Sequence, residues 1–289
     1  MDKKRLYSPS YVKEIIDKYN FRFSKGLGQN FLIDGNIVRK ICEEGEVSKE
    51  DDILEIGPGI GTLTEELSYK ANKVVAVELD KSLFPILDET LAGCNNVEIV
   101  PGDILKIDLP KLFSEKFESE NIKIVANLPY YITTPIIGRL LEEELDIDSI
   151  LVMVQSEVAE RMKASPGTKD YGSLSVFVQY YTDPEIVLSV PKTAFMPRPN
   201  VDSAVIKLKI RKEKIELEDR ETFFKVVKAA FFQRRKTILN SLSSGLKTDK
   251  ATIRAILEKV DIDPKLRAEN LTIEDFSKIS AILPPFNIY

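Results

Sequence analysis

Residues 52–190 alternate short apolar runs with stretches of helical pattern, and this alternation limits the folds open to the chain. The apolar runs predict strands at Ile53–Ile56, Lys73–Val77, Val97–Val100, Ile122–Ala126 and Ile150–Val154. Helical patterns lie between most of these strands, at Thr62–Ser68, Lys81–Leu91 and Pro135–Glu144. This order is typical of a parallel sheet with helices on both faces.

Two further runs predict how the sheet ends. Glu185–Val190 and Ser203–Ile210 have the pattern of strands, and only the proline-rich segment 191–199 separates them. Because that connection is too short for a helical crossover, we expect the two strands to be antiparallel. The predicted fold class is therefore α/β, with an open, mostly parallel sheet that ends in one reversed strand.

From about Leu217 onward the pattern is helical. One apolar stripe at helical spacing comprises Phe224, Val227, Phe231, Ile238 and Leu242. Later helices are expected at Lys250–Val260 and Thr272–Ile282. Since 289 residues exceed the usual size of one domain, we predict two. The first is a catalytic domain over residues 1–212 with an N-terminal extension, and the second is a small helical domain over residues 213–289.

The composition excludes several kinds of site. The chain contains no histidine, which removes the commonest general base, the Ser-His and Cys-His nucleophile pairs and most zinc sites. The two cysteines, Cys42 and Cys94, cannot form a metal site and indicate a reducing cytoplasm. Residues 1–20 are charged and lack an apolar run, so they predict neither a signal peptide nor a membrane span. Chemistry must then depend on positioning, on carboxylates or on a cofactor.

Charge is distributed unevenly along the chain, although its net value is −5. Residues 26–189 carry 14 Lys and Arg against 30 Asp and Glu, whereas residues 190–250 carry 15 against 7. Local patches, rather than the total, decide whether phosphate is attracted. The distribution favours an acidic catalytic body with a basic surface that contacts nucleic acid. A solvated, lysine-rich helical face is the alternative.

The most informative motif is Asn127-Leu128-Pro129-Tyr130, which follows a buried strand. The Asn127 amide and the Leu128 carbonyl can accept hydrogen bonds from an exocyclic amine, and Tyr130 can stack on a flat base. Pro129 stiffens the loop because its ring fixes φ. The sequence therefore predicts a site for a base with an amino group. A proline turn with a core tyrosine is the alternative.

A second constellation predicts a nucleoside cofactor. Gly57, Gly59 and Gly61 follow the first strand, and such glycines let the backbone approach a ligand closely. A dinucleotide fingerprint would place its third glycine where the chain has Thr62. Glu78 ends the next strand and Asp103 follows the third, where carboxylates can bind ribose hydroxyls and an adenine amine.

Together these motifs resemble the ribosomal RNA adenine dimethyltransferases, a family of S-adenosylmethionine-dependent enzymes, and in particular their KsgA/RsmA branch. The resemblance is carried by Lys25–Leu32, Glu55–Gly61, Asn127–Tyr130, Phe195–Ser203 and Phe231–Thr237. It spans about residues 20–245 and departs at Gly26, where the family more often has serine or another residue. The fold implied is the Rossmann-like methyltransferase sheet.

The resemblance also implies roles for individual residues and no metal. The cofactor S-adenosylmethionine would be contacted by Asn30, Leu32, Gly57, Gly59, Glu78, Asp103 and Asn127. We expect Phe195 to cover the second face of the target base, with a core phenylalanine as the alternative. Arg234, Arg235 and Lys236 are expected on a helix beside the cleft, where they would hold RNA phosphates. Because the two arginines interrupt the apolar stripe, pairing of one with an internal carboxylate is the alternative.

The reaction implied is the addition of two methyl groups to N6 of each of two adjacent adenosines. These lie in the hairpin loop near the 3′ end of 16S ribosomal RNA, within an immature small subunit. We expect a monomer that acts in the cytoplasm and has no membrane partner. Two other functions remain open here: an RNA-binding assembly checkpoint with methylation secondary, and a nicotinamide-dependent reductase, which Thr62 and the lack of histidine disfavour.

Overall fold

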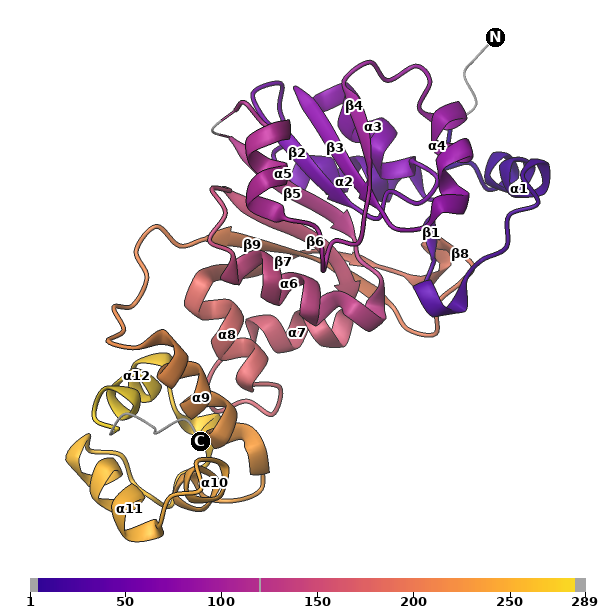
Figure 1. Ribbon diagram of the computed structural model, residues 1–289. Coiled ribbons are helices and arrows are strands. Elements are labelled where there is room, and N and C mark those ends of the chain that lie inside the picture. The colour runs from indigo at the N-terminus through magenta and orange to yellow at the C-terminus, as the bar shows by residue number, and fades with distance from the viewer. Residues whose placement is uncertain (1–4, 120, 284–289) are drawn as a thin grey trace. The chain divides into compact units, whose positions relative to one another are not determined.

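The computed structural model describes residues 5–119 and 121–283, and the chain divides into two compact units. The sheet unit comprises Met1–Ala159 and Glu185–Ile210, and the helical unit comprises Glu160–Pro184 and Arg211–Tyr289. The ends of the chain, residues 1–4 and 284–289, belong to the predicted domains but lie outside the described residues. Figure 1 identifies the elements of each unit.

A seven-stranded sheet has the order β4-β3-β2-β5-β6-β9-β7. Its strands are β2 (Asp52–Ile56), β3 (Lys73–Glu78), β4 (Val97–Pro101), β5 (Ile122–Asn127), β6 (Ser149–Gln155), β7 (Thr182–Val190) and β9 (Ser203–Ile210). The neighbours from β4 to β6 are parallel, and β9 runs antiparallel to β6. The predicted strands and the mostly parallel sheet with one reversed strand are confirmed.

The position of the reversed strand differs from the prediction. Strand β9 does not end the sheet but lies between β6 and β7, so β7 forms the edge. Burial explains this order, because β9 is buried along most of its length whereas β7 is partly or fully exposed along most of its length. Strand β7 also contains Pro184, which has no N–H to donate and is tolerated at an edge.

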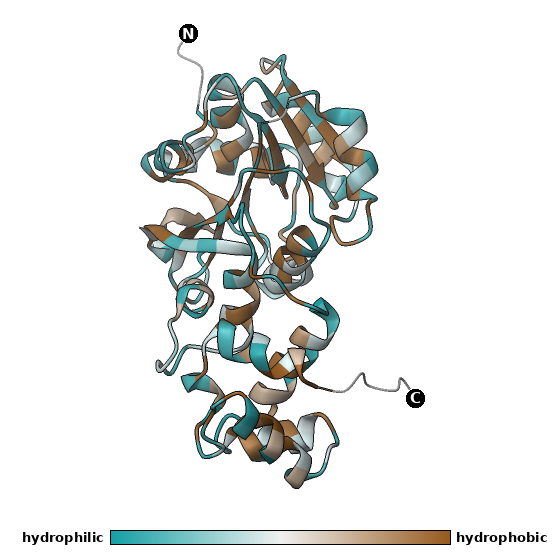
Figure 2. Ribbon diagram, turned by 90° about the vertical axis from the view of Figure 1, so that its left-hand side faces the viewer, coloured by the Kyte–Doolittle hydropathy of each residue, from teal (hydrophilic) through white to brown (hydrophobic). Residues whose placement is uncertain are grey.

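Apolar side chains join the helices of the sheet unit to the sheet. These helices are α1 (Pro9–Lys18), α2 (Gly35–Glu44), α3 (Thr62–Lys70), α4 (Phe84–Thr90), α5 (Leu109–Lys116) and α6 (Thr133–Glu142). Val38 of α2 and Leu67 of α3 pack in one core with Val74, Val125 and Val205 of the sheet. Figure 2 shows the strands coloured as predominantly hydrophobic. Helices α3, α4 and α6 were predicted, whereas α1, α2 and α5 were not.

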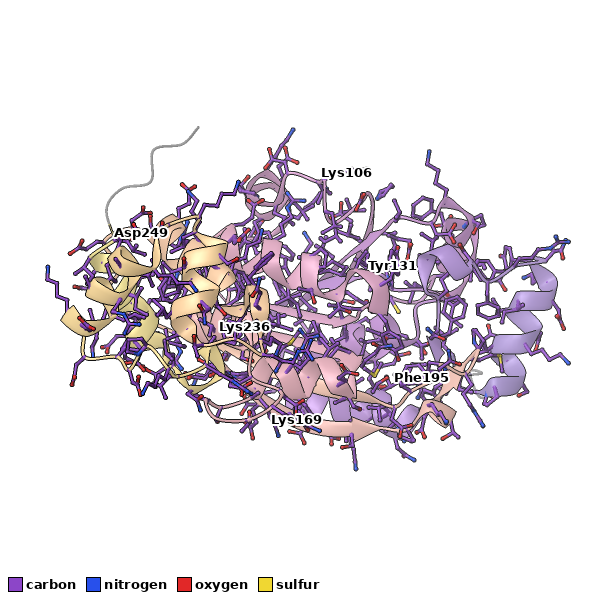
Figure 3. All side chains as sticks on the ribbon, turned by 90° about the horizontal axis from the view of Figure 1, so that it is seen from below. Lys106, Tyr131, Lys169, Phe195, Lys236 and Asp249 are labelled. Atoms are coloured by element: carbon purple, nitrogen blue, oxygen red, sulfur yellow. The ribbon has the colours of Figure 1, made fainter. Side chains whose placement is uncertain are left out.

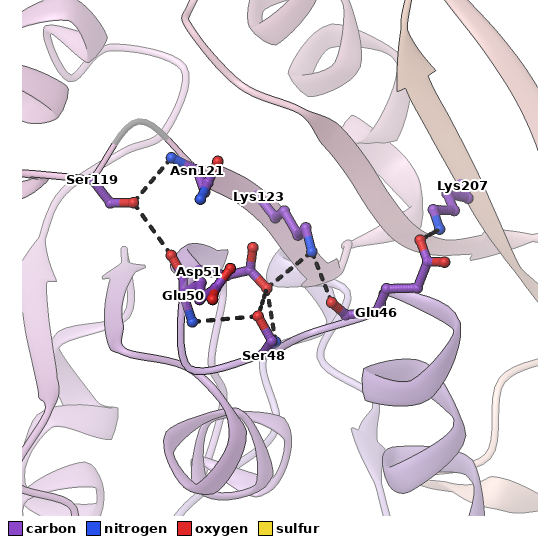
Figure 4. Close-up of polar contacts among 8 residues, drawn as sticks. All are labelled: Glu46, Ser48, Glu50, Asp51, Ser119, Asn121, Lys123 and Lys207. Carbon is purple, nitrogen blue, oxygen red and sulfur yellow. Dashed lines mark hydrogen bonds and ion pairs between the residues drawn. The ribbon is translucent and has the colours of Figure 1, made fainter.

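A polar network lies at the beginning of β2 and β5, at the opposite ends of these strands from their carboxyl ends (Figure 4). The Lys123 amine on β5 lies 2.9 Å from Asp51 Oδ2 and donates to the Glu46 carbonyl at 2.8 Å. Lys207 of β9 pairs with the Glu46 carboxylate. These bonds tie the loop before β2 to two strands.

The helical unit contains α8 (Ser173–Tyr181), α9 (Arg220–Ala230), α10 (Ile238–Gly245), α11 (Lys250–Lys259) and α12 (Ile273–Ala281), and the second half of α7 (Ser156–Lys163). The predicted helices at 250–260 and 272–282 are confirmed. Segment 160–184 was assigned to the first domain, but it joins this unit instead. The reason is aromatic packing: the Phe224 ring centroid on α9 lies 5.3 Å from Phe177 and 5.5 Å from Tyr180 on α8.

Candidate active site in the sheet unit

A pocket opens where the parallel strands of the sheet unit reach their carboxyl ends. It is lined by residues 27–32, by residues 55–60 at the end of β2, by residues 77–79 at the end of β3, by residues 102–104 after β4 and by residues 127–132 at the end of β5. Ligands of open α/β sheets bind at this edge. The pocket unites the predicted cofactor residues Asn30, Leu32, Gly57, Gly59, Glu78, Asp103 and Asn127 with Leu128, Pro129 and Tyr130.

The glycine turn after β2 lies at this edge of the sheet, and its backbone angles require glycine. Gly57 and Gly59 have φ values of 68° and 61°, and Gly61, at the start of α3, has 89°. L-residues other than glycine rarely adopt such angles. A Cβ added at Gly57 would meet no atom within 4 Å, whereas one at Gly59 would lie 3.1 Å from the Phe31 ring. The backbone at Gly57 therefore leaves room for a ligand.

Carboxylates line one side of the pocket. Glu78 is buried, its Oε1 accepts a hydrogen bond from the Asp80 amide at 2.7 Å, and burial raises the pKa of its carboxyl. Asp80 in turn accepts a bond of 2.6 Å from Gln29, a pocket residue for which the sequence predicted no role. Asp103 accepts from the Leu105 amide at 3.0 Å. Both predicted acceptors for a nucleoside are therefore held in place.

Three other pocket residues fit a bound cofactor. Leu79 follows Glu78, is 47% exposed and lines the pocket together with Ile104, so both offer apolar surface to a flat ring. Glu55 is fully buried at the pocket wall, its Oε2 has no hydrogen-bond partner in the part of the chain that is described, and burial raises its pKa to about 8. An unpartnered buried carboxyl group fits a ligand that brings a hydrogen-bonding group.

The Asn127–Tyr130 loop lines the pocket and contains two acceptors without a hydrogen bond among the described residues. The Asn127 Nδ2 donates to the Asn30 carbonyl at 3.1 Å, which fixes the amide and leaves its oxygen on the other side. The Leu128 side chain is buried, and its N–H donates to the Met153 carbonyl at 3.2 Å. Within residues 5–119 and 121–283, neither the Asn127 side-chain oxygen nor the Leu128 carbonyl accepts a hydrogen bond. These two acceptors are those that the sequence predicted for an amine.

Tyr130 lines the pocket, and its hydroxyl contacts a residue of the sheet. Its hydroxyl lies 2.6 Å from the Ser203 Oγ on β9, and burial raises the pKa of this phenol. The Pro129 carbonyl accepts bonds from the Ile132 amide at 3.2 Å and from the Thr133 hydroxyl at 3.1 Å. The loop is therefore fixed at both ends, which suits an aromatic ring that must hold a base in one orientation.

Phe195 does not line this pocket, so its contact with the target base stays a prediction. Its side chain is 3% exposed and belongs to the core that includes Leu32 and Val38. The reason is the pairing of two short strands, β1 (Phe31–Leu32) and β8 (Phe195–Met196), which places Phe195 opposite Leu32. Figure 3 labels Phe195 and Tyr131.

The basic motif of the helical unit also differs from its prediction. Arg234, Arg235 and Lys236 lie in a turn between α9 and α10 rather than on a helix, and all three side chains are exposed. The Arg234 guanidinium donates to the backbone carbonyls of Lys169 and Tyr171 rather than to a carboxylate, which was the alternative expected from the sequence. Figure 3 labels Lys236 and Lys169. Arg234 therefore stabilises a loop of its own unit, whereas the side chains of Arg235 and Lys236 have no polar partner among the described residues.

The sheet and its pocket define a Rossmann-like S-adenosylmethionine-dependent methyltransferase. A family model described as "Ribosomal RNA adenine dimethylase" matches residues 20–284. The chain belongs to this family, so it is an enzyme that methylates ribosomal RNA, and the alternative of a nicotinamide-dependent reductase is excluded.

Two known proteins are similar in sequence to this chain over nearly its whole length. The "Ribosomal RNA small subunit methyltransferase A" of Clostridioides difficile (strain 630) is 54% identical over 280 residues, which are 96% of this chain and 97% of that protein. The protein of the same name from Alkaliphilus metalliredigens (strain QYMF) is 52% identical over 282 residues, 97% of this chain and 98% of that protein.

Solved structures support the same fold. The crystal structure of a dimethyladenosine transferase from Plasmodium falciparum has a TM-score of 0.72 and 28% identity, and the match covers 86% of this chain and 95% of that one. The 23S rRNA methyltransferase ErmE has a TM-score of 0.64 and 29% identity, with 87% and 98% covered. Among the described residues, no helix has the length and hydropathy needed to cross a lipid bilayer.

Proposed function

We propose that this enzyme adds two methyl groups to N6 of each of two adjacent adenosines in the hairpin loop near the 3′ end of 16S ribosomal RNA. Two findings support the choice of this RNA. The family is described by adenine dimethylation, and relatives more than 50% identical over nearly their full length carry a small-subunit name. The proposal also fits the resemblance of the Asn127–Tyr130 and Phe195–Ser203 motifs.

The observation that carries the proposal is the pair of available acceptors, the Asn127 side-chain oxygen and the Leu128 carbonyl. The lone pair of an adenine N6 is delocalised into the ring and is a poor nucleophile. Two acceptors that bond both N6 hydrogens favour a pyramidal nitrogen whose lone pair points away from the ring. They also stabilise the positive charge that develops on the nitrogen. Tyr130 stacks on the base and adds a weak cation–π attraction.

The cofactor pocket supplies the second reactant. Bound S-adenosylmethionine provides a methyl group that its positively charged sulfur already activates. Glu78 and Asp103 would hold its ribose and adenine, Asn30 and Asn127 would contact it beside the target base, and the backbone at Gly57 admits it. Holding both reactants in line contributes on the order of 7–11 kcal/mol to the lowering of the barrier. The methylated amine is acidic enough to lose its proton to water, which suits a chain without histidine.

We further propose that the substrate is an incompletely assembled small subunit and that the enzyme acts as a monomer. All residues that line the pocket come from the sheet unit of one chain, which supports a site that needs no second copy. The basic turn at Arg235 and Lys236 would contact RNA phosphates. Light scattering of the free enzyme tests the monomer, and comparison of immature subunits, mature subunits and naked RNA as substrates tests the assembly state.

Methylation of immature small subunits with labelled cofactor, followed by mapping of the modified bases, tests the proposal. We expect label in two adjacent adenosines of the 3′-terminal hairpin and up to four methyl groups per subunit. Asn127→Ala should lower the methylation rate by about 10²–10³, as loss of a transition-state hydrogen bond does in other enzymes. Asn36→Ala, an exposed change on α2, is the control. Label at other bases, or in large-subunit RNA, contradicts the proposed substrate.

An assembly-checkpoint role makes a different prediction in cells. If binding rather than turnover is the main function, a strain with Asn127→Ala keeps the phenotype of the wild type although its ribosomal RNA lacks the methyl groups. If methylation is the main function, the variant has the phenotype of a strain without the enzyme.

A further inference from the structure

Tyr131 is an exposed aromatic side chain at the pocket that the proposed mechanism does not use. Among the described residues, six large apolar side chains are exposed, and Leu79 and Tyr131 are the two that line the pocket. Leu79 lies on the cofactor side, next to Glu78, whereas Tyr131 lies in the loop that begins with Asn127. Its side chain is 53% exposed. An aromatic ring that is open to water beside a substrate site is available for a ligand.

Tyr131 differs from its neighbour Tyr130 in what holds it. The Tyr130 hydroxyl bonds to Ser203, whereas the Tyr131 hydroxyl makes no hydrogen bond within residues 5–119 and 121–283. Two consecutive tyrosines of one short 3₁₀ turn are therefore directed to different surroundings. No polar contact of the described chain accounts for a tyrosine at this exposed position.

The Tyr131 ring is nevertheless held in place. A Cβ added at Gly28 would lie 3.1 Å from Cδ1 and 3.4 Å from Cε1 of this ring, so the ring edge packs against the Gly28 backbone. Gly28 has a φ of 59°, which also favours glycine. The 3₁₀ turn itself is fixed by the bonds of Ile132 and Thr133 to the Pro129 carbonyl. A ring that is fixed and exposed can stack on a ligand without losing much conformational freedom.

The geometry points to a stacking subsite: we propose that Tyr131 holds the unpaired base next to the adenine bound at Asn127. This inference rests on the proposed function, in which the two adenosines are adjacent in a single-stranded loop. When one adenine is bound at Asn127, its neighbour lies one nucleotide away, and Tyr131 lies four residues along the same protein loop. Bases of single-stranded RNA are commonly bound by stacking on exposed aromatic rings. The ligand is therefore a purine base recognised by its flat face.

The lack of tryptophan in the chain allows a direct test by fluorescence. Tyr131→Trp introduces a single indole, whose emission is expected to be quenched when a hairpin RNA with two adjacent loop adenosines binds. An abasic nucleotide beside the methylated position should abolish the quenching. Tyr69→Trp is the matched control, because Tyr69 is 43% exposed on α3 and does not line the pocket. Binding of each RNA is measured separately by the anisotropy of a dye on its end.

Three results of this test would overturn the inference. The first is unchanged emission of Tyr131→Trp with RNA that is shown to be bound. The second is equal quenching with the abasic RNA. The third is quenching by S-adenosylmethionine alone, which would place Tyr131 in the cofactor site instead.

Steady-state kinetics with immature small subunits provide the second test, which does not require a naked hairpin to bind. Loss of stacking on one base weakens binding about 5- to 150-fold, so Tyr131→Ala should raise the KM for the subunit by a factor in this range. The KM for S-adenosylmethionine should stay the same. Tyr131→Phe should restore the lower KM because stacking needs the ring and not the hydroxyl.

The kinetic outcomes separate this inference from the proposed function. If the wild type methylates both adenosines and Tyr131→Ala has the wild-type KM for the subunit, the stacking subsite is wrong and the function stands. If the wild type does not methylate these adenosines, the proposed function itself fails. An equal rise in both KM values would indicate a general disturbance of the pocket and would also refute the subsite.

Discussion

Glu78 is the residue for which we propose a role in cofactor binding alone. Its side chain is buried at the end of β3 and already accepts the Asp80 amide. Since hydrogen bonds to a charged group contribute about 1.5–3 kcal/mol each, Glu78→Ala should weaken S-adenosylmethionine binding by about ten- to a hundredfold. Isothermal titration measures this, and Glu43→Gln, an exposed change on α2, is the control. An unchanged dissociation constant would refute a cofactor contact at this position.

Glu55 is expected to make the stability of the free enzyme depend on pH. Burial raises the pKa of Glu55 to about 8 in the folded protein, from an ordinary value of 4.5. Between these values the folded chain binds more protons than the unfolded chain, so this contribution is complete below about pH 4.5 and is lost as the pH rises through 8.

The corresponding variant is Glu55→Gln, whose neutral amide resembles the protonated acid. Without added cofactor, it should raise the free energy of unfolding at pH 9 by about 2–4 kcal/mol relative to the wild type, and by little at pH 5. Urea denaturation at both pH values measures the difference. An equal effect at pH 5 and pH 9 would mean that Glu55 is ionised in the folded protein.

At the scale of an element, alanine variants of the glycine turn after β2 can distinguish the effect of backbone strain on folding from an effect on cofactor binding. Gly57 and Gly167 both have positive φ values, 68° and 86°, and a Cβ at either would meet no atom within 4 Å. Alanine at either position should therefore cost a similar 1–2 kcal/mol of folding free energy. Only Gly57→Ala should also weaken cofactor binding, because its methyl group enters the pocket. Thermal denaturation and cofactor titration of both variants test this, and equal cofactor affinities would contradict a role for this turn.

The strands and helices also differ in how well the sequence predicted them. Apolar runs between helical patterns located all seven strands of the main sheet, because buried strands of a parallel sheet are marked by their own side chains. Helix α2 was missed although Asp34 caps it by accepting from the amides of Asn36 and Ile37, a signal that the sequence contains. The burial of Phe195 and the edge position of β7 depend on pairing between distant segments, which local patterns do not encode.

The residues of the candidate site were likewise predictable where local patterns locate them, and not where distant segments meet. Its predicted acceptors Asn127, Glu78 and Asp103 stand at strand ends, so their convergence follows from the parallel topology. Gln29 and Tyr131 lie in connecting segments, and only the folded chain shows that they line the pocket. In the helical unit, the apolar stripe suggested one helix through residues 231–237, whereas the chain turns there.

For the whole molecule, the segregation of charge along the chain has a consequence for RNA binding. The basic segment 190–250 includes the turn at Arg234, Arg235 and Lys236, and the acidic remainder of the chain repels phosphate. Arg234 donates to the carbonyls of Lys169 and Tyr171, so it stabilises the turn, whereas the exposed side chains of Arg235 and Lys236 have no polar partner among the described residues. The three residues are therefore expected to differ in their effects although the sequence groups them together.

Salt titration distinguishes these effects. The logarithm of the affinity for RNA falls linearly with the logarithm of the salt concentration. The slope is about 0.7–0.9 for each phosphate that the protein neutralises. Arg235→Ala and Lys236→Ala should each reduce the salt slope by about one contact and leave the melting temperature unchanged. Arg234→Ala should mainly lower the melting temperature, because two carbonyls lose their donor. Lys111→Ala, an exposed change on α5 that pairs with Glu115, is the control. If the slope is the same for the wild type and for Arg235→Ala and Lys236→Ala, this turn does not contact phosphate, and the basic surface that recognises RNA must lie elsewhere in the segment.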